Sequence, residues 1–119
     1  MTPQQLLDNA LAKPGAWPDN PWGHDHPVVK VGEPGKIFLF VGATTAGVKA
    51  GPNREVADEW LTRYPDDASV MAYIGRSGWN DLTFGSAIPD EEILEAVDES
   101  YRLDVSKLPA KQRPAGWEG

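Results

Sequence analysis

The sequence has no cysteine among its 119 residues. Disulfide bonds, thiolate catalysis and cysteine-ligated zinc or iron–sulfur clusters are therefore excluded. Long apolar runs are also missing, because the longest, residues 37–41, is far shorter than the roughly 20 residues that a membrane-spanning helix needs. The first residues have no basic stretch followed by an apolar run, so no secretion signal is predicted and we expect a cytoplasmic protein.

Positive charge is in the minority. The formal net charge is -7 and the sequence pI is near 4.7, so the whole molecule repels nucleic acids and anionic membranes. Residues 26–54 are the exception, with four basic residues against one acid, whereas residues 88–104 hold seven acids against one arginine. We therefore expect a polarised molecule that does not bind membranes and that needs a separate basic patch to bind any polyanion.

The composition, 40% hydrophobic and 24% charged, is typical of a globular protein, and the length predicts a single domain over residues 1–119. Three helices are expected. The first has Thr2 as its N-cap and Gln5 completing a capping box, and it ends at residues 14–15. The second lies between Pro52 and Pro65. The third starts at Pro89 and runs to residues 108–109.

Short β-branched and aromatic runs predict strands at residues 28–31, 36–41, 69–74 and 79–84, with a weaker one at residues 47–50. Residues 32–35 and 75–78 are tight hairpin connections, and the proline-rich residues 16–27 are an ordered loop. Regular alternation places Phe38 and Phe40 on one face of their strand, opposite Ile37, Leu39 and Val41. The order α-β-β-β-α-β-β-α predicts an α+β fold of two layers, an antiparallel sheet with helices.

An ordered set of turn, packing and capping motifs runs along most of the chain. They are PGA at residues 14–16, PWG at 21–23, VKVG at 29–32, GKIF at 35–38, Pro65, Trp79, PDEE at 89–92, ESY at 99–101 and KLP at 107–109. With these motifs in this order, the chain resembles the MmcQ/YjbR-like family. The resemblance implies a fold similar to frataxin-type (CyaY-like) proteins, two hairpin wings suggestive of DNA binding, and no enzymatic activity.

This resemblance leads to the first functional prediction, a non-enzymatic protein that binds DNA weakly and in a salt-sensitive way through the two wings. The family commonly has a run of Tyr, His, Met, Asn and Lys before the hairpin tryptophan, and residues 72–78 keep only its Tyr73 and Arg76. The candidate nucleic-acid-binding residues are Lys30, Lys36, Lys49, Tyr73 and Arg76. Trp22 and Tyr73 are a further pair that can stack on a base.

The alternative prediction is a protein-interaction or chaperone-like adaptor that docks a partner on an uncovered sheet face containing Phe38 and Phe40. In either case we expect a monomer or a weak dimer.

Three other motifs favour structural interpretations. His24 and His26 alternate on an extended segment and point apart, so they do not meet at one metal. Residues 42–49 resemble a phosphate-binding loop, but Val48 occupies the lysine position, so no nucleotide hydrolysis is expected. The acids of residues 90–99 are typical of a solvated helix face. We therefore predict no catalytic residues, no metal site and no cofactor.

Overall fold

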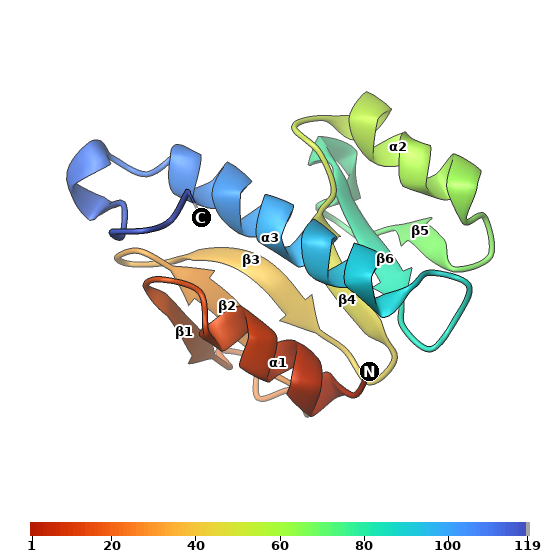
Figure 1. Ribbon diagram of the computed structural model, residues 1–119, viewed down its shortest axis with the longest axis horizontal. Helices are drawn as coiled ribbons and strands as arrows, with labels where there is room; N and C mark the ends of the chain where they lie inside the picture. The colour runs from red at the N-terminus through yellow and green to blue at the C-terminus, as the bar shows by residue number, and fades with distance from the viewer. Residues whose placement is uncertain (119) are drawn as a thin grey trace.

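The computed structural model describes residues 1–118. Within them the chain forms three α-helices, six β-strands and two short 3-10 helices (Figure 1). The elements in chain order are α1 (Pro3–Leu11), β1 (Ala16–Asp19), β2 (Val28–Val31), β3 (Lys36–Val41), β4 (Thr45–Lys49), α2 (Arg54–Arg63), β5 (Ala68–Val70), η1 (Gly75–Ser77), β6 (Trp79–Thr83), α3 (Asp90–Ser106) and η2 (Ala110–Gln112).

The six strands form one antiparallel sheet in the order β1-β2-β3-β4-β6-β5. Helix α1 packs on β1 to β3, α3 packs on β3 and β4, and α2 packs on β5 and β6 (Figure 1). The prediction of an α+β fold with an antiparallel sheet and a helical layer is confirmed. The three helices cover one face of the sheet, and the other face is left open.

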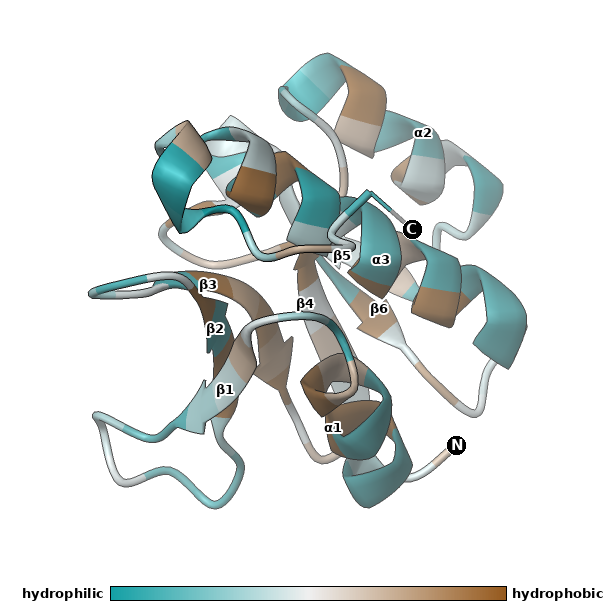
Figure 2. Ribbon diagram, turned by 60° about the vertical axis from the view of Figure 1, so that its left-hand side comes forward, coloured by the Kyte–Doolittle hydropathy of each residue, from teal (hydrophilic) through white to brown (hydrophobic). Residues whose placement is uncertain are grey.

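The helix ends follow the local sequence. Thr2 and Gln5 form the predicted capping box, and Asn53 caps α2 by accepting a hydrogen bond from the Val56 amide. Brown apolar bands alternate with teal polar ones along α1 and α3 in Figure 2, as expected for helices with one face on a sheet. None of the helices within residues 1–118 has the length and apolarity that a bilayer span requires.

Two local predictions are wrong. Residues 16–19 are not a loop but the edge strand β1, where Pro18 is tolerated because one side of an edge strand needs no amide donor. Residues 71–74 are not a strand, because Tyr73 has a φ of 66° and turns the chain out of the sheet. The connection from β5 to β6 is consequently a longer loop containing η1, not a tight hairpin at residues 75–78.

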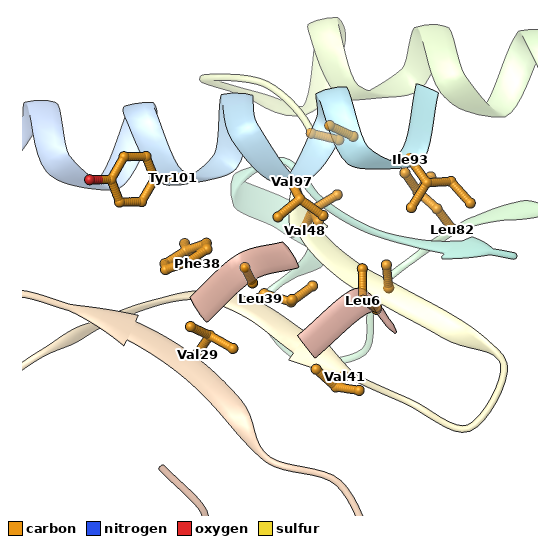
Figure 3. Close-up of a cluster of buried hydrophobic side chains, with 14 of the residues drawn as sticks. Leu6, Val29, Phe38, Leu39, Val41, Val48, Leu82, Ile93, Val97 and Tyr101 are labelled. Atoms are coloured by element: carbon orange, nitrogen blue, oxygen red, sulfur yellow. The ribbon is translucent and has the colours of Figure 1, made fainter. Parts of the chain in front are cut away.

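The core lies between the sheet and helices α1 and α3 (Figure 3). Tyr101 of α3 meets Phe38 of β3 edge to face, with ring centroids 5.2 Å apart, and its hydroxyl donates a hydrogen bond to the Pro14 carbonyl. Further along α3, Val97 and Ile93 are fully buried in the same cluster. The four-residue spacing seen in the sequence is therefore the packed stripe of α3.

One extra residue in β3 interrupts the alternation of its side chains. Lys30 of β2 pairs with Ile37, and the residue before Lys30 pairs with Leu39, so the ladder skips Phe38. A bulge of this kind changes which side chains share a face. Phe38 and Leu39 are both fully buried in the core, whereas Ile37 and Phe40 are half-buried on the open face. The prediction that Phe38 and Phe40 share a face is wrong.

Candidate functional site

A groove of ≈ 950 Å³ lies on the open face of the sheet. Strands β3 and β6 form its floor, the segments around Trp22 and Tyr73 border it, and the last turn of α3 reaches one end of it. It combines aromatic and aliphatic side chains with lysines and aspartates. A concave surface with an apolar lining and a few convergent polar groups is the usual form of a binding site.

Three aromatic rings make the apolar part of this groove. Trp22 stacks on Phe40 with centroids 6.4 Å apart and ring planes within 16° of parallel, and Phe40 meets Trp79 edge to face at 5.5 Å. Trp79 is buried, but 56% of the Trp22 surface is exposed. The stack therefore ends in an indole ring that is still open to a flat ligand group.

Tyr73 borders the same groove in a strained conformation. Its side chain is fully exposed and its φ of 66° is unfavourable for any residue other than glycine. The loop around Tyr73 is bonded to α2, because the Arg54 guanidinium donates hydrogen bonds to the carbonyls of Gly75 (2.7 Å) and Trp79 (3.1 Å). Strain of this kind is typical of ligand-contacting segments that the surrounding structure holds in place.

Lysines gather at one end of the groove. Lys36 from β3, Lys49 from β4 and Lys107 just after α3 all line it, together with Asp104 from the last turn of α3. Burial lowers the pKa of Lys49, and the positive charge of the neighbouring Lys107 lowers it further. Asp104 is also buried. We call these four residues the lysine end of the groove.

Asp104 is a buried carboxyl group with an unsatisfied oxygen. It is 8% exposed, and its Oδ2 atom has no hydrogen-bond partner. Burial raises the pKa of Asp104 to about 6, although the charges of Lys36, Lys107 and Lys49 act in the opposite direction. The lysines thus influence this carboxyl through space, without a direct ion pair within residues 1–118.

The lysine end lies where β3 and β4 separate. Their pairing stops at Leu39 with Val48, and beyond it the Ser100 hydroxyl accepts from the Lys49 amide (3.0 Å) and donates to the Phe38 carbonyl (2.6 Å). Ser100 therefore replaces one rung of the ladder with a side chain from α3. Its hydroxyl is used structurally at this point.

Of the five candidate nucleic-acid-binding residues, the structure places three in the groove and two outside its lining. Lys36, Lys49 and Tyr73 line the groove. Lys30 does not, because its ammonium pairs with Asp19 (2.6 Å) and lies over the Trp17 ring. Arg76 is exposed on η1, outside the residues that line the groove.

Sequence reasoning missed Asp104 and Lys107. It counted Asp104 only in the acidic charge of residues 88–104, although the apolar stripe through Val97 and Tyr101 continues to that position. An acid on the buried stripe of an amphipathic helix is the signal that could have found Asp104.

The other carboxyl group in the groove is that of Asp81 on β6, and burial raises its pKa.

His24 lies beside the aromatic part of the groove. The His24 ring is 5.8 Å from that of Trp22 and borders the groove. Within residues 1–118 no three histidine, aspartate or glutamate side chains are placed together so as to hold a metal ion.

The family model YjbR matches residues 11–103 of this chain. The chain belongs to the YjbR family. It is 26% identical over 117 residues to the uncharacterized protein YjbR of Escherichia coli strain K12, with 95% of each chain covered. The same identity and coverage hold for YjbR of Escherichia coli O157:H7.

Two crystal structures share the fold. The Deinococcus radiodurans protein DR2400, with domain DUF419, superposes with a TM-score of 0.81 at 20% identity, covering 94% of this chain and 85% of that one. A Pseudomonas syringae protein superposes with a TM-score of 0.67 at 18% identity, covering 87% of this chain and 98% of that one. The family resemblance read from the motifs is therefore confirmed, and the α+β fold matches that of these neighbours.

Proposed function

We propose that this chain is a non-enzymatic, cytoplasmic binding protein that holds single-stranded DNA in the groove on the open face of its sheet. One observation carries the proposal: Lys36, Lys49 and Lys107 lie in the same groove as the exposed aromatic rings of Trp22 and Tyr73. Proteins that bind single strands combine a positive groove for the phosphates with aromatic rings on which bases stack.

The distribution of unpaired charge supports this proposal. Five of the eleven lysines and arginines form ion pairs with carboxylates. Of the six without an ion pair within residues 1–118, half lie at the lysine end of the groove. In a molecule with a net charge of -7, this is where positive charge is left available for a phosphate backbone.

The binding mode differs from the one predicted from the sequence. Two projecting hairpins suit the grooves of a duplex, but of the two predicted wings only the connection at residues 32–35 is a hairpin turn. An open sheet face with exposed aromatic rings, those of Trp22 and Tyr73, suits bases that are not paired. We therefore expect single-stranded DNA to bind more tightly than the duplex of the same sequence.

Fluorescence anisotropy of a labelled strand of about 20 nucleotides tests this proposal. With three phosphate contacts, affinity for the single strand should fall roughly 20-fold between 50 and 200 mM salt, and the slope should become shallower in Lys36→Gln/Lys107→Gln. Lys30→Gln and Lys111→Gln are the matched controls, since Lys30 is paired with Asp19 and Lys111 lies outside the groove lining. No binding at about 50 mM salt, or a preference for the duplex, would contradict the proposal.

Exposed apolar side chains favour a second candidate, a protein-docking role. Val70, at the end of β5, is 48% exposed, and Ile74, which follows Tyr73 and lines the groove, is 37% exposed. Exposed apolar side chains of this kind are typical of surfaces that dock another protein. If the single strand does not bind, this adaptor role becomes the leading candidate.

A further inference from the structure

The lysine end of the groove contains a hydrogen-bond acceptor without a donor. Asp104 Oδ2 is buried and unpartnered, and buried polar atoms of native proteins nearly always have a partner. An ionised carboxylate can only accept, so the missing partner is a group that carries a proton. Lys36, Lys49 and Lys107 do not supply it within hydrogen-bonding distance.

The same place has an excess of positive charge. Three ammonium groups surround one carboxylate, and each of them acts on the Asp104 carboxyl through space. A ligand group that satisfies both features has to be anionic, to meet the lysines, and has to carry a proton, to meet Asp104. A simple carboxylate or sulfate ester has the charge without the proton.

A phosphate monoester has both properties. Its second ionisation has a pKa of about 6, so near neutral pH it carries negative charge while still holding a P–OH group for part of the time. A phosphodiester within a strand has no such proton. A site that requires this proton therefore recognises the phosphorylated end of a DNA strand and not its interior.

We propose that the lysine end of the groove is a subsite for the terminal phosphate monoester of a single DNA strand, with Asp104 sharing the proton of that phosphate. The inference rests on the proposed function and adds a ligand group to it. The lysines contact the charged oxygens of the phosphate, and the neighbouring bases extend over Phe40 toward Trp22. No bond is made or broken, so the step is binding alone.

The raised pKa of Asp104 supports this assignment. At a pH near 6 the carboxyl and the phosphate each hold a proton part of the time, so one proton can be shared between them. At about pH 8 both groups are ionised and repel each other across the subsite. The preference for a terminal phosphate should therefore weaken as the pH rises.

The test compares three fluorescent strands of one sequence, about 20 nucleotides long, with a phosphate at the 5′ end, at the 3′ end, or at neither. At about pH 6 we expect one of the phosphorylated strands to bind about tenfold more tightly than the unphosphorylated one, as a charge-assisted hydrogen bond predicts. Asp104→Asn should remove the decline of this preference at higher pH, because an amide does not ionise and its N–H group can donate to the phosphate at either pH. His24, which also lines the groove, is present in both proteins, so its contribution cancels in the comparison.

Lys107→Gln is a second variant, on an exposed position where folding is not at risk, and it should reduce the preference because one positive charge is removed. Equal binding of all three strands would overturn this inference and leave the proposed function standing. Binding of none of them would overturn both. Adenosine monophosphate or inorganic phosphate binding as tightly as the strand would show a site for free phosphates and would overturn the assignment to a strand end.

Discussion

Phe38 and Phe40 are two residues apart in one strand, yet Phe38 packs against Tyr101 in the core and Phe40 stacks with Trp22 on the opposite face. The bulge at Phe38 makes this possible, because it adds one residue to β3 without adding one to β2. Next to the bulge, the pairing of β3 with β4 ends at Leu39 and leaves the gap that Ser100 bridges. A single extra residue thus shapes both the core and the groove.

The two phenylalanines should differ in their contribution to stability. Phe38→Ala removes a fully buried ring and should lower the free energy of unfolding by about 3–5 kcal/mol. Phe40→Ala removes a half-buried ring and should cost only about 1–2 kcal/mol, while weakening binding in the groove. Urea denaturation of both variants is the measurement. Equal losses of stability would show that the two rings are equally buried, contrary to the bulge.

Ser100 should contribute more to the stability of the fold than its small side chain suggests. Ser100→Ala leaves the Lys49 amide and the Phe38 carbonyl without their hydroxyl partner, and we expect a loss of about 1–3 kcal/mol. Ser106→Ala is the control, because its exposed hydroxyl bonds only to the Leu103 carbonyl of the same helix. If the two variants unfold at the same urea concentration, Ser100 does not hold the strands together.

Asp104 should make the protein less stable as the pH rises. Its pKa is about 6 in the folded protein, compared with an ordinary value of 3.8, so the folded state binds the proton more tightly than the unfolded state. Stability contributed by the protonated form is therefore complete below about pH 4 and is lost as the pH rises to about 6. Asp104→Asn should accordingly stabilise the protein by about 2–3 kcal/mol at pH 7 and hardly at all at pH 4.

Urea denaturation of both proteins at the two pH values measures this difference, with the other titrating groups common to both. A variant that is less stable than the native protein at pH 7 would mean that the carboxylate has a favourable partner there.

Arg54 should control the loop that carries Tyr73. Arg54→Gln removes the guanidinium bonds to the Gly75 and Trp79 carbonyls, so amide hydrogens of residues 71–79 should exchange faster and stability should fall by about 1–3 kcal/mol. Arg102→Gln is the control, because its partners lie on its own helix and are solvent-accessible. If the amide hydrogens of residues 71–79 exchange at the same rate in Arg54→Gln, contacts other than those of Arg54 hold the loop.

The sequence predicted the layers of this fold better than it predicted the groove. Helix caps, the stripe of α3 and the runs of β2, β3 and β6 are local signals, and each was recovered from residues close together in the chain. The bulge at Phe38 is not local, since it depends on which residue of β2 meets which residue of β3. Once the register shifts, every face assignment in that strand shifts with it.

The candidate binding residues show the same limit. Lys36, Lys49 and Tyr73 were selected as cations and an aromatic ring, and the fold brings them to one groove. Lys30 was selected for the same reason, but its partner Asp19 lies in a strand that was predicted to be a loop. Pairing between distant charges could not be predicted from composition alone.

The central claim is that ligand binds on the open face of the sheet, and the tryptophans test it most directly. In a two-dimensional 15N–1H NMR spectrum each of the five indole groups gives its own signal. On titration with the phosphorylated single strand we expect the indole signals of Trp22 and Trp79, which line the groove, to shift, while those of Trp60 and Trp117 stay in place. Shifts confined to Trp60, on α2, would place the binding surface on the helical layer and contradict this account.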